Sequence, residues 1–223
     1  PLQPGVLRVT MELAQAMGFQ LGATPGREVR LRFLRPTSAD GKLAGKTIVV
    51  DAGHGGADSG ARAPGGSLLE KNLTLAISKL VADSLAREGA AVLLTRTDDT
   101  KVGLKERSDQ ANRSRADLFV SIHINSNRVA NSRSGVTSYY HRNDPMGILL
   151  AECLRRELAA VSGLPDLGTA SDTRVYTSGF RFCATRRCPR YCSNWGSSTT
   201  PATERGFRRR TFTRRWPKPC SKG

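Results

Sequence analysis

Residues 47–56 read Thr-Ile-Val-Val-Asp-Ala-Gly-His-Gly-Gly, and this stretch decides the fold. The apolar run from Ile48 to Val50 predicts a buried strand, and the glycines after it predict a loop where the strand ends. His54 is therefore expected at the carboxyl end of a strand. Glu70 begins a long helical pattern farther along, so an imidazole and a carboxylate can meet above the edge of the sheet.

A second predicted strand carries another histidine. Residues 117–127 read Asp-Leu-Phe-Val-Ser-Ile-His-Ile-Asn-Ser-Asn, and the alternation separates an apolar face from a mixed one. The mixed face holds Phe119, Ser121, His123 and Asn125. In open parallel sheets ligands bind outside the carboxyl ends of the strands. His54, Glu70 and His123 would then form a His/Glu/His set, which suits zinc with a fourth position open for water.

Five motifs in this order carry a family resemblance. They are Asp-Ala-Gly-His-Gly-Gly, Leu-Glu-Lys-Asn-Leu, Leu-Leu-Thr-Arg-Thr-Asp, Leu-Lys-Glu-Arg-Ser-Asp-Gln-Ala-Asn and Ser-Ile-His-Ile-Asn. Together they resemble the zinc-dependent N-acetylmuramoyl-L-alanine amidases (amidase type 3) of bacterial cell-wall turnover. The resemblance runs from about Lys46 to Phe180. The alternative is two polar core or loop histidines and a surface glutamate.

The resemblance implies a three-layer α/β/α domain over residues 46–180, with a mostly parallel twisted sheet. In that family the positions that match His54, Glu70 and His123 hold zinc, and we expect Asn125 to bind substrate. The implied substrate is peptidoglycan, cut between N-acetylmuramic acid and L-alanine, for cell-wall turnover or daughter-cell separation. The implied location is the cell envelope, either periplasmic or extracellular.

The strands and helices expected between these motifs alternate along the chain. The helix expected over residues 70–88 has Leu73, Ile77, Leu80, Val81 and Leu85 at core spacing. Strands are expected over residues 90–95, 118–125 and 136–140, and helices end near residues 115 and 160. His141 follows a strand and is expected to contact water or substrate rather than metal. Cys153 is expected to be a small core residue.

The two ends of the chain differ from this middle part. Residues 1–45 contain alternating runs at residues 6–9 and 29–33, which predict a remnant β segment or hairpin followed by a linker. The chain begins at Pro1 with neither an initiator Met nor a signal-peptide pattern, which predicts a processed or truncated piece. No run of 18 apolar residues occurs, so no transmembrane segment is expected.

The net charge of +16 would suggest binding to nucleic acid, but its distribution argues against a specific nucleic-acid partner. Residues 181–223 hold twelve Lys and Arg against one acid, Glu204, and so carry +11 of that charge. Four of the five cysteines also lie there. An arginine-rich tail can bind polyanions nonspecifically, and the cysteines could form a zinc site or disulfides, although their spacing lacks a paired C-x2-C.

The resemblance breaks at Arg181. The family continues with Pro-Ala-Val-Leu-Val-Glu-Leu-Gly-Phe, whose Glu is the general base, and no matching glutamate follows Phe180 here. Tyr191 to Ser197 can be encoded TAC TGC TCG AAC TGG GGT TCA. Read from the third base, this DNA encodes Leu-Leu-Glu-Leu-Gly-Phe. The tail is therefore interpreted as a frameshifted reading of the gene, irregular in structure.

The missing glutamate leaves two functions open. The first is a zinc amidase by family, inactive or severely impaired as written, because removing a general base costs about 10²- to 10⁴-fold in rate. The second is a noncatalytic peptidoglycan-binding or regulatory protein that keeps the zinc cleft.

Overall fold

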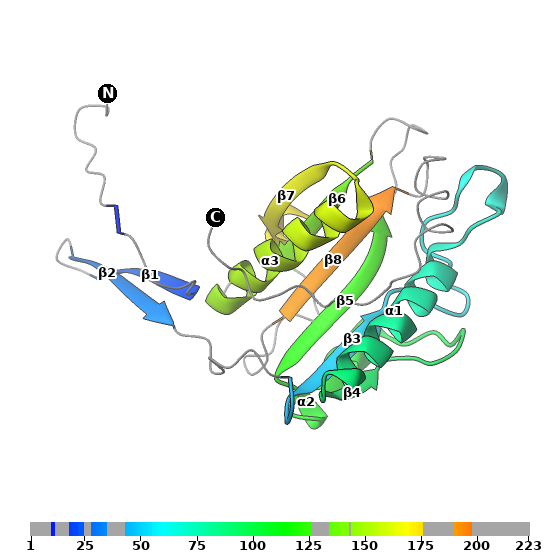
Figure 1. The fold of residues 1–223 in the computed structure, drawn as a ribbon, viewed down its shortest axis with the longest axis horizontal. Coiled ribbons are helices and arrows are strands. Elements are labelled where there is room, and N and C mark those ends of the chain that lie inside the picture. The colour runs from blue at the N-terminus through cyan, green and yellow to red at the C-terminus, as the bar shows by residue number, and fades with distance from the viewer. Residues whose placement is uncertain are drawn as a thin grey trace.

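A six-stranded sheet forms the centre of the computed structural model, which describes residues 10–11, 18–24, 28–34, 43–125, 134–142, 144–175 and 190–197. Its strands lie in the order β4-β3-β5-β8-β6-β7 (Figure 1). The strands of the sheet are β3 (Thr47–Ala52), β4 (Ala91–Leu94), β5 (Leu118–Asn125), β6 (Val136–Tyr140), β7 (Asp166–Ser171) and β8 (Arg190–Ser197). The helices are α1 (Glu70–Arg87), α2 (Leu104–Arg113) and α3 (Pro145–Ser162), with 3-10 turns at Pro64–Gly66 and Asp172–Arg174.

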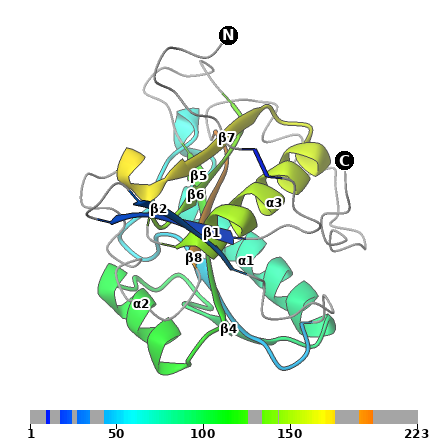
Figure 2. The same cartoon turned by 90° about the vertical axis from the view of Figure 1, so that its left-hand side faces the viewer.

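Helices cover both faces of the sheet, which confirms the predicted three-layer α/β/α architecture. Ile48 and Val50 of β3 pack on one side in a cluster with Ile77 of α1. Val49 points the other way and packs with Ala111 of α2. Figure 2 shows α2 on one side of the sheet and α1 and α3 on the other. This alternation is the period-two pattern expected of a strand buried on both faces.

One expected core position of α1 is wrong. Ile77 and Leu85 are buried, whereas Leu80 is 50% exposed. The buried strip of the helix runs through the small residues Thr74 and Ser78, which let α1 approach the sheet closely. At 100° per residue this strip is turned away from Leu80, so an apolar residue at helical spacing lies outside the core.

The sheet is mostly parallel, but β6 runs in the opposite direction to β5 and β8. This direction decides at which end of the sheet His141 lies. Strands β4, β3, β5 and β8 are parallel, whereas β6 pairs antiparallel with β8. Tyr140 at the end of β6 is opposite Tyr191, which is opposite Val120 near the start of β5. His141 therefore follows the carboxyl end of β6, which lies beside the amino end of β5 and so at the opposite end of the strands from His123. The expectation that His141 contacts substrate at the predicted site is wrong for this topological reason.

The expected irregular tail contains a regular strand. Residues Arg190–Ser197 form β8, parallel to β5 on one side and antiparallel to β6 on the other. Without β8, β5 and β6 would each present unpaired backbone N–H and C=O groups in the middle of the sheet. The hydrogen bonds between strands use backbone groups only. A segment without hydrophobic alternation can therefore pair with both β5 and β6. The rest of residues 181–223 lies outside the described part.

An N-terminal hairpin lies beside this domain. Strands β1 (Gly18–Thr24) and β2 (Glu28–Leu34) pair antiparallel, and β1 packs against α3. β2 matches the strand expected at residues 29–33, whereas the run at residues 6–9 lies outside the described residues. Among the described helices, none combines the length and apolar character that a membrane crossing requires.

Replacing Ser193 with proline tests the strand β8. Proline removes one backbone donor between two neighbouring strands, and an unpaired buried partner costs about 1–3 kcal/mol. We expect Ser193→Pro to lower the Tm in thermal unfolding by about 5 °C or more. Ser193→Ala keeps the N–H group and is the matched control. Equal Tm values for the two variants would mean that residues 190–197 contribute no strand.

Candidate metal centre

The first candidate ligand lies in a loop that only a few backbone conformations allow. β3 ends at Ala52, and His54 follows with φ 63°, in the left-handed region that non-glycine residues seldom adopt. Gly55 and Gly56 continue with φ 132° and 57°. These glycines let the chain turn sharply, and the turn directs the His54 imidazole toward the start of α1.

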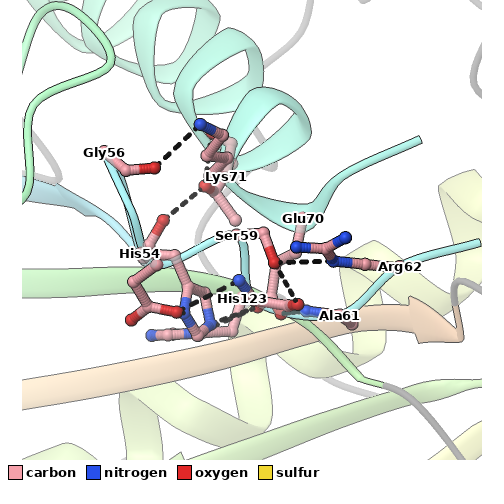
Figure 3. A network of polar contacts seen from close by, with 12 residues as sticks. His54, Gly56, Ser59, Ala61, Arg62, Glu70, Lys71 and His123 are labelled. Carbon is pink, nitrogen blue, oxygen red and sulfur yellow. Dashed lines mark hydrogen bonds and ion pairs between the residues drawn. The ribbon is translucent and has the colours of Figure 1, made fainter. Parts of the chain in front are cut away.

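The structure brings His54, Glu70 and His123 together, as the sequence predicts. Glu70 Oε1 lies 3.1 Å from His54 Nε2 and 3.0 Å from His123 Nδ1. One possible ligand atom from each residue lies within 4.8 Å of the other two. Figure 3 shows both imidazoles directed at the Glu70 carboxylate from β3's loop and from β5.

The spacing of these atoms fits a small tetrahedral metal ion. With bonds of about 2.0–2.1 Å, two ligand atoms of a tetrahedral zinc site lie roughly 3.3–3.4 Å apart. The two distances from Glu70 Oε1 are 3.1 and 3.0 Å, only slightly shorter than that spacing. Two imidazole nitrogens and one carboxylate oxygen are also a donor set that suits divalent metals. The three ligand atoms lie within 4.8 Å of one another, so the residues could converge on such an ion.

Glu70 is fixed by its position as well as by the histidines. It is the first residue of α1, where the helix dipole favours a negative charge, and it is only 4% exposed. Its Oε1 accepts a hydrogen bond from Ile124 N at 2.8 Å, and its Oε2 accepts one from Ala61 N at 2.8 Å. Both oxygens are thus held by backbone groups, which sets the direction of the carboxylate.

The contacts between Glu70 and the histidines favour the charged forms of Glu70 and His54. Burial disfavours the ionised form of Glu70, but the hydrogen bonds from His123 and His54 outweigh it and hold its pKa well below the usual range. Burial likewise lowers the pKa of His54, yet the contacts with Glu70 and then with Asp58 together outweigh it and raise that pKa. A metal ion would replace the protons that the imidazoles share with this carboxylate.

Asp58 completes the surroundings of His54 on its other side. Asp58 Oδ1 lies 3.0 Å from His54 Nδ1, the ring nitrogen that faces away from Glu70. A carboxylate behind a ligating histidine selects the tautomer and the ring orientation. Sequence reasoning did not single out Asp58, because an aspartate four residues after a histidine in a loop is common.

Two glycines make room for the ligands. A Cβ on Gly60 would lie 2.5 Å from Glu70 Oε2 and 2.6 Å from His54 Cδ2. A Cβ on Gly53 would lie 2.6 Å from His123 Nδ1. Real Cβ atoms do not approach other atoms this closely. The backbone must therefore lack side chains at both positions for the three ligands to converge.

Two buried arginines hold the backbone beneath His54. Arg107 of α2 donates to Ala52 O at 2.6 Å and to His54 O at 2.9 Å, and it pairs with Asp51 at 2.6 Å. Arg96, which follows β4, donates to Ala52 O and Gly53 O at 3.0 Å each. Both side chains are less than 5% exposed. Burial and then the nearby charge of Arg107 lower the pKa of Arg96.

A third cation, Lys71, holds the loop that carries His54 through hydrogen bonds on the side of α1. Lys71 Nζ donates to Gly56 O at 2.9 Å and to Asp99 Oδ2 at 2.5 Å, and Asp99 Oδ1 accepts from Gly56 N. The Lys71 hydrogen bond holds the pKa of Asp99 below its usual value. Figure 3 shows Lys71 reaching from α1 to Gly56. The peptide groups on both sides of Gly56 are thereby tied to the start of α1 and to the loop after β4.

A pocket of about 130 Å³ adjoins the three ligands on the side of α2. His54 and His123 line it together with the segment from Lys101 to Leu104. Its acids are Asp51, which pairs with Arg107, and Asp58, which lies beside His54. In the described part of the chain, no glutamate lines this pocket as a general base would.

The other residues singled out from the sequence are Asn125, Cys153 and the glutamate expected after Phe180. Asn125 ends β5, two residues after His123 and on the same face of that strand. Cys153 lies half-buried on α3. The family's glutamate was expected beyond Phe180, and the backbone of β8 gives a register there: Asn194 is opposite His123 and Ser193 is opposite Ile122.

Comparisons with known proteins find amidases. The model of a family described as N-acetylmuramoyl-L-alanine amidase matches residues 48–215, beyond Phe180, where the motif resemblance ends. The uncharacterized protein YqiI of Bacillus subtilis (strain 168) is 50% identical over 98 residues, 44% of this chain and 46% of that protein. The N-acetylmuramoyl-L-alanine amidase LytC of the same organism is 41% identical over 128 residues, 56% of this chain and 25% of that protein.

A solved structure extends the similarity to the fold. The N-acetylmuramoyl-L-alanine amidase from Clostridium difficile 630 is similar with a TM-score of 0.66 and 30% identity, over 74% of this chain and 86% of that chain. The chain spans less than half the length of the two curated relatives.

The close approach at Gly60 predicts the effect of a single methyl group. Gly60→Ala places a Cβ against Glu70 and His54, and we expect metal affinity to fall by about 10- to 100-fold, as for other changes around metal ligands. Gly65→Ala is the control, because Gly65 has φ 81° and a Cβ added there would meet no atom within 4 Å. Competition with a chromophoric chelator measures both affinities. Equal losses in the two variants would attribute the effect to backbone strain alone.

Proposed function

This chain belongs to the N-acetylmuramoyl-L-alanine amidase family, and from that premise we propose that its site is built to hydrolyse the amide between N-acetylmuramic acid and L-alanine in peptidoglycan, with zinc as the metal. The observation that carries the proposal is the convergence of His54 Nε2, His123 Nδ1 and Glu70 Oε1. The amidases named above, similar to this chain in sequence or in fold, support it. The setting would be the cell envelope, in wall turnover or daughter-cell separation.

The chain's own residues prepare the site for this reaction. When bound, zinc supplies a Lewis acid that activates water and polarises the scissile carbonyl. Glu70 stays ionised and offsets the positive charge of the metal, because its pKa lies well below the usual range. Asp58 orients the His54 ring, and the arginines beneath the loop fix its backbone. The pocket on the side of α2 gives a substrate group a place beside the two imidazoles.

A proton must still move from water to the leaving amine. The family resemblance assigns this step to a glutamate that the chain lacks as written. Asp51 is engaged with Arg107, Thr95 and Ser121, and Asp58 is directed at His54. Neither acid is therefore suited to replace the base. We expect the chain as written to hydrolyse its substrate weakly or not at all.

The same proposal includes a frameshift near residue 181. Its support is the register of β8, since the glutamate of the shifted reading would span the codons of Ser193 and Asn194. Those two positions lie opposite Ile122 and His123. The family match also continues to residue 215, so the tail occupies the length that the family's own sequence would fill.

A noncatalytic role is the second candidate, and the missing glutamate favours it. A chain that keeps the metal ligands but not the base could bind peptidoglycan without cutting it. Sedimentation of the zinc-loaded chain with purified peptidoglycan tests this role, because a chain that does not bind contradicts it. An assay for released peptide separates the two candidates only in the repaired chain described below, which should cut if the chain is an amidase by descent.

The three histidines of the chain allow a controlled test of the ligands. We expect His54→Ala and His123→Ala each to reduce zinc bound per chain, measured by elemental analysis after dialysis, because each leaves two ligands. His141→Ala should leave zinc content unchanged, since His141 follows the strand end at the opposite edge of the sheet. Unchanged zinc in both of the first two variants would remove them from the ligand set.

Repair of the tail tests the catalytic part. In the repaired chain, residues 181–203 are replaced by the shifted reading, which contains Leu-Leu-Glu-Leu-Gly-Phe. We expect it to release peptide from peptidoglycan about 10²- to 10⁴-fold faster than the chain as written.

Two further measurements accompany that comparison. The repaired chain with glutamine in place of the restored glutamate separates the base from the strand, and it should stay slow. Genomic sequencing across the codons for Ser178 to Gly206 should reveal one base missing or extra. An unchanged gene together with an inactive repaired chain would contradict the frameshift.

A further inference from the structure

The pocket beside the metal ligands has a wall that the proposed chemistry does not use. Lys101, Val102, Gly103 and Leu104 form this wall, and His54 and His123 line the same pocket. A group that enters the pocket lies next to both imidazoles, and so next to the bond that the site would cut. The wall is therefore placed to recognise the part of the substrate adjacent to that bond.

The wall is rigidly joined to the loop that carries His54. A Cβ on Gly55 would collide with Thr100 O, and one on Gly56 would lie 3.0 Å from Lys101 Cβ. Arg107 Nε donates to Val102 O at 3.0 Å while Nη2 of the same residue donates to His54 O. One guanidinium thus fixes the wall and the metal-ligand loop relative to each other, as a recognition surface requires.

Lys101 differs from the other cations around the loop. Lys71, Arg96 and Arg107 direct their donors at protein oxygens. Lys101 is exposed and lines the pocket, and its charge interacts with that of Asp58 without a salt bridge or hydrogen bond among the described residues. Of the two acids on the same pocket, Asp51 pairs with Arg107 and Asp58 Oδ1 lies 3.0 Å from His54 Nδ1. The ammonium of Lys101 is available to an anion that enters.

Leu104 supplies an apolar surface on the same wall. It is 54% exposed, and Val102 beside it also lines the pocket. The pocket thus combines a cation with apolar side chains in a space the size of a single amino-acid residue.

We propose that this pocket binds the peptide side of the substrate, with Leu104 against the alanine at the scissile amide and Lys101 paired with a carboxylate on the next residue. This inference rests on the proposed amidase function. On the sugar side, the lactyl carboxyl is consumed in the amide and carries no charge. On the peptide side, the residue after alanine keeps a free carboxylate unless it has been amidated. Lys101 therefore distinguishes acidic from amidated stem peptides.

Two muramyl dipeptides test this, because they differ only at that carboxyl group. With the γ-carboxyl group capped as a methylamide in both, N-acetylmuramoyl-L-alanyl-D-glutamate carries the free α-carboxylate, and the D-isoglutamine form carries the α-amide. Calorimetric titration of the zinc-loaded full chain should give about fivefold tighter binding of the carboxylate form, the upper end for an exposed ion pair. Lys101→Ala should bind both forms equally, whereas Lys101→Arg should keep the preference.

Matched controls separate the pocket from general effects of charge and hydrophobicity. Lys105→Ala removes an 87% exposed lysine that pairs with Asp109, and it should keep the preference. Leu104→Ala should weaken both dipeptides by about fivefold, because it removes apolar contact area. Leu80→Ala removes a leucine of similar exposure on α1 and should weaken neither.

The outcomes distinguish this inference from the function on which it rests. Equal binding of both forms to the unchanged chain, or a preference that survives Lys101→Ala, overturns the role of Lys101 and leaves the amidase proposal standing. If neither form binds the zinc-loaded chain, both the pocket and the proposed function fail.

Discussion

The hydrogen bonds from two buried arginines to the end of β3 are the constraint on which the site depends. Arg96 and Arg107 together engage the carbonyl oxygens of Ala52, Gly53 and His54. Burying a guanidinium is unfavourable unless its donors are satisfied, and here Asp51 and the backbone carbonyls satisfy them. The cations reach the loop from the segments after β4 and within α2. The neighbouring glycines allow the conformation of His54, with its positive φ, and these tertiary contacts hold it.

Two of the three proposed ligands could be predicted from the sequence because they lie on regular elements, and His54 could be predicted because it closely follows the end of a clear apolar strand. His123 is on a strand with clear alternation, and Glu70 begins a helix. The roles of Arg96, Arg107 and Gly60 could not be predicted in this way. Each depends on a contact between segments that are distant in sequence, and an arginine in a polar helix is usually on the surface. Leu80 shows the same limit in reverse, since helical spacing alone does not reveal which arc of α1 faces the sheet.

The strand β8 shows that the requirements for forming the sheet differ from the requirements for catalysis. Its backbone pairs with β5 and β6 although its sequence lacks the expected alternation. Any segment without proline can supply such hydrogen bonds, whereas proton transfer requires one carboxylate at one position. Under the frameshift proposed here, the shape of the domain tolerates a change that its chemistry does not.

The order of the strands in the sheet has a consequence for how the chain is made. All three proposed ligands lie between β3 and β5, so the ribosome completes the metal-binding half before β6, α3 and β7 are synthesised. β8 is the last strand in the chain, yet it lies beside β5 at the centre of the sheet. Throughout synthesis the edge of β5 remains open to other extended segments, because nascent domains begin to fold from the amino end. A chain that stalls before residue 190 would carry its metal ligands on a half-sheet prone to aggregation.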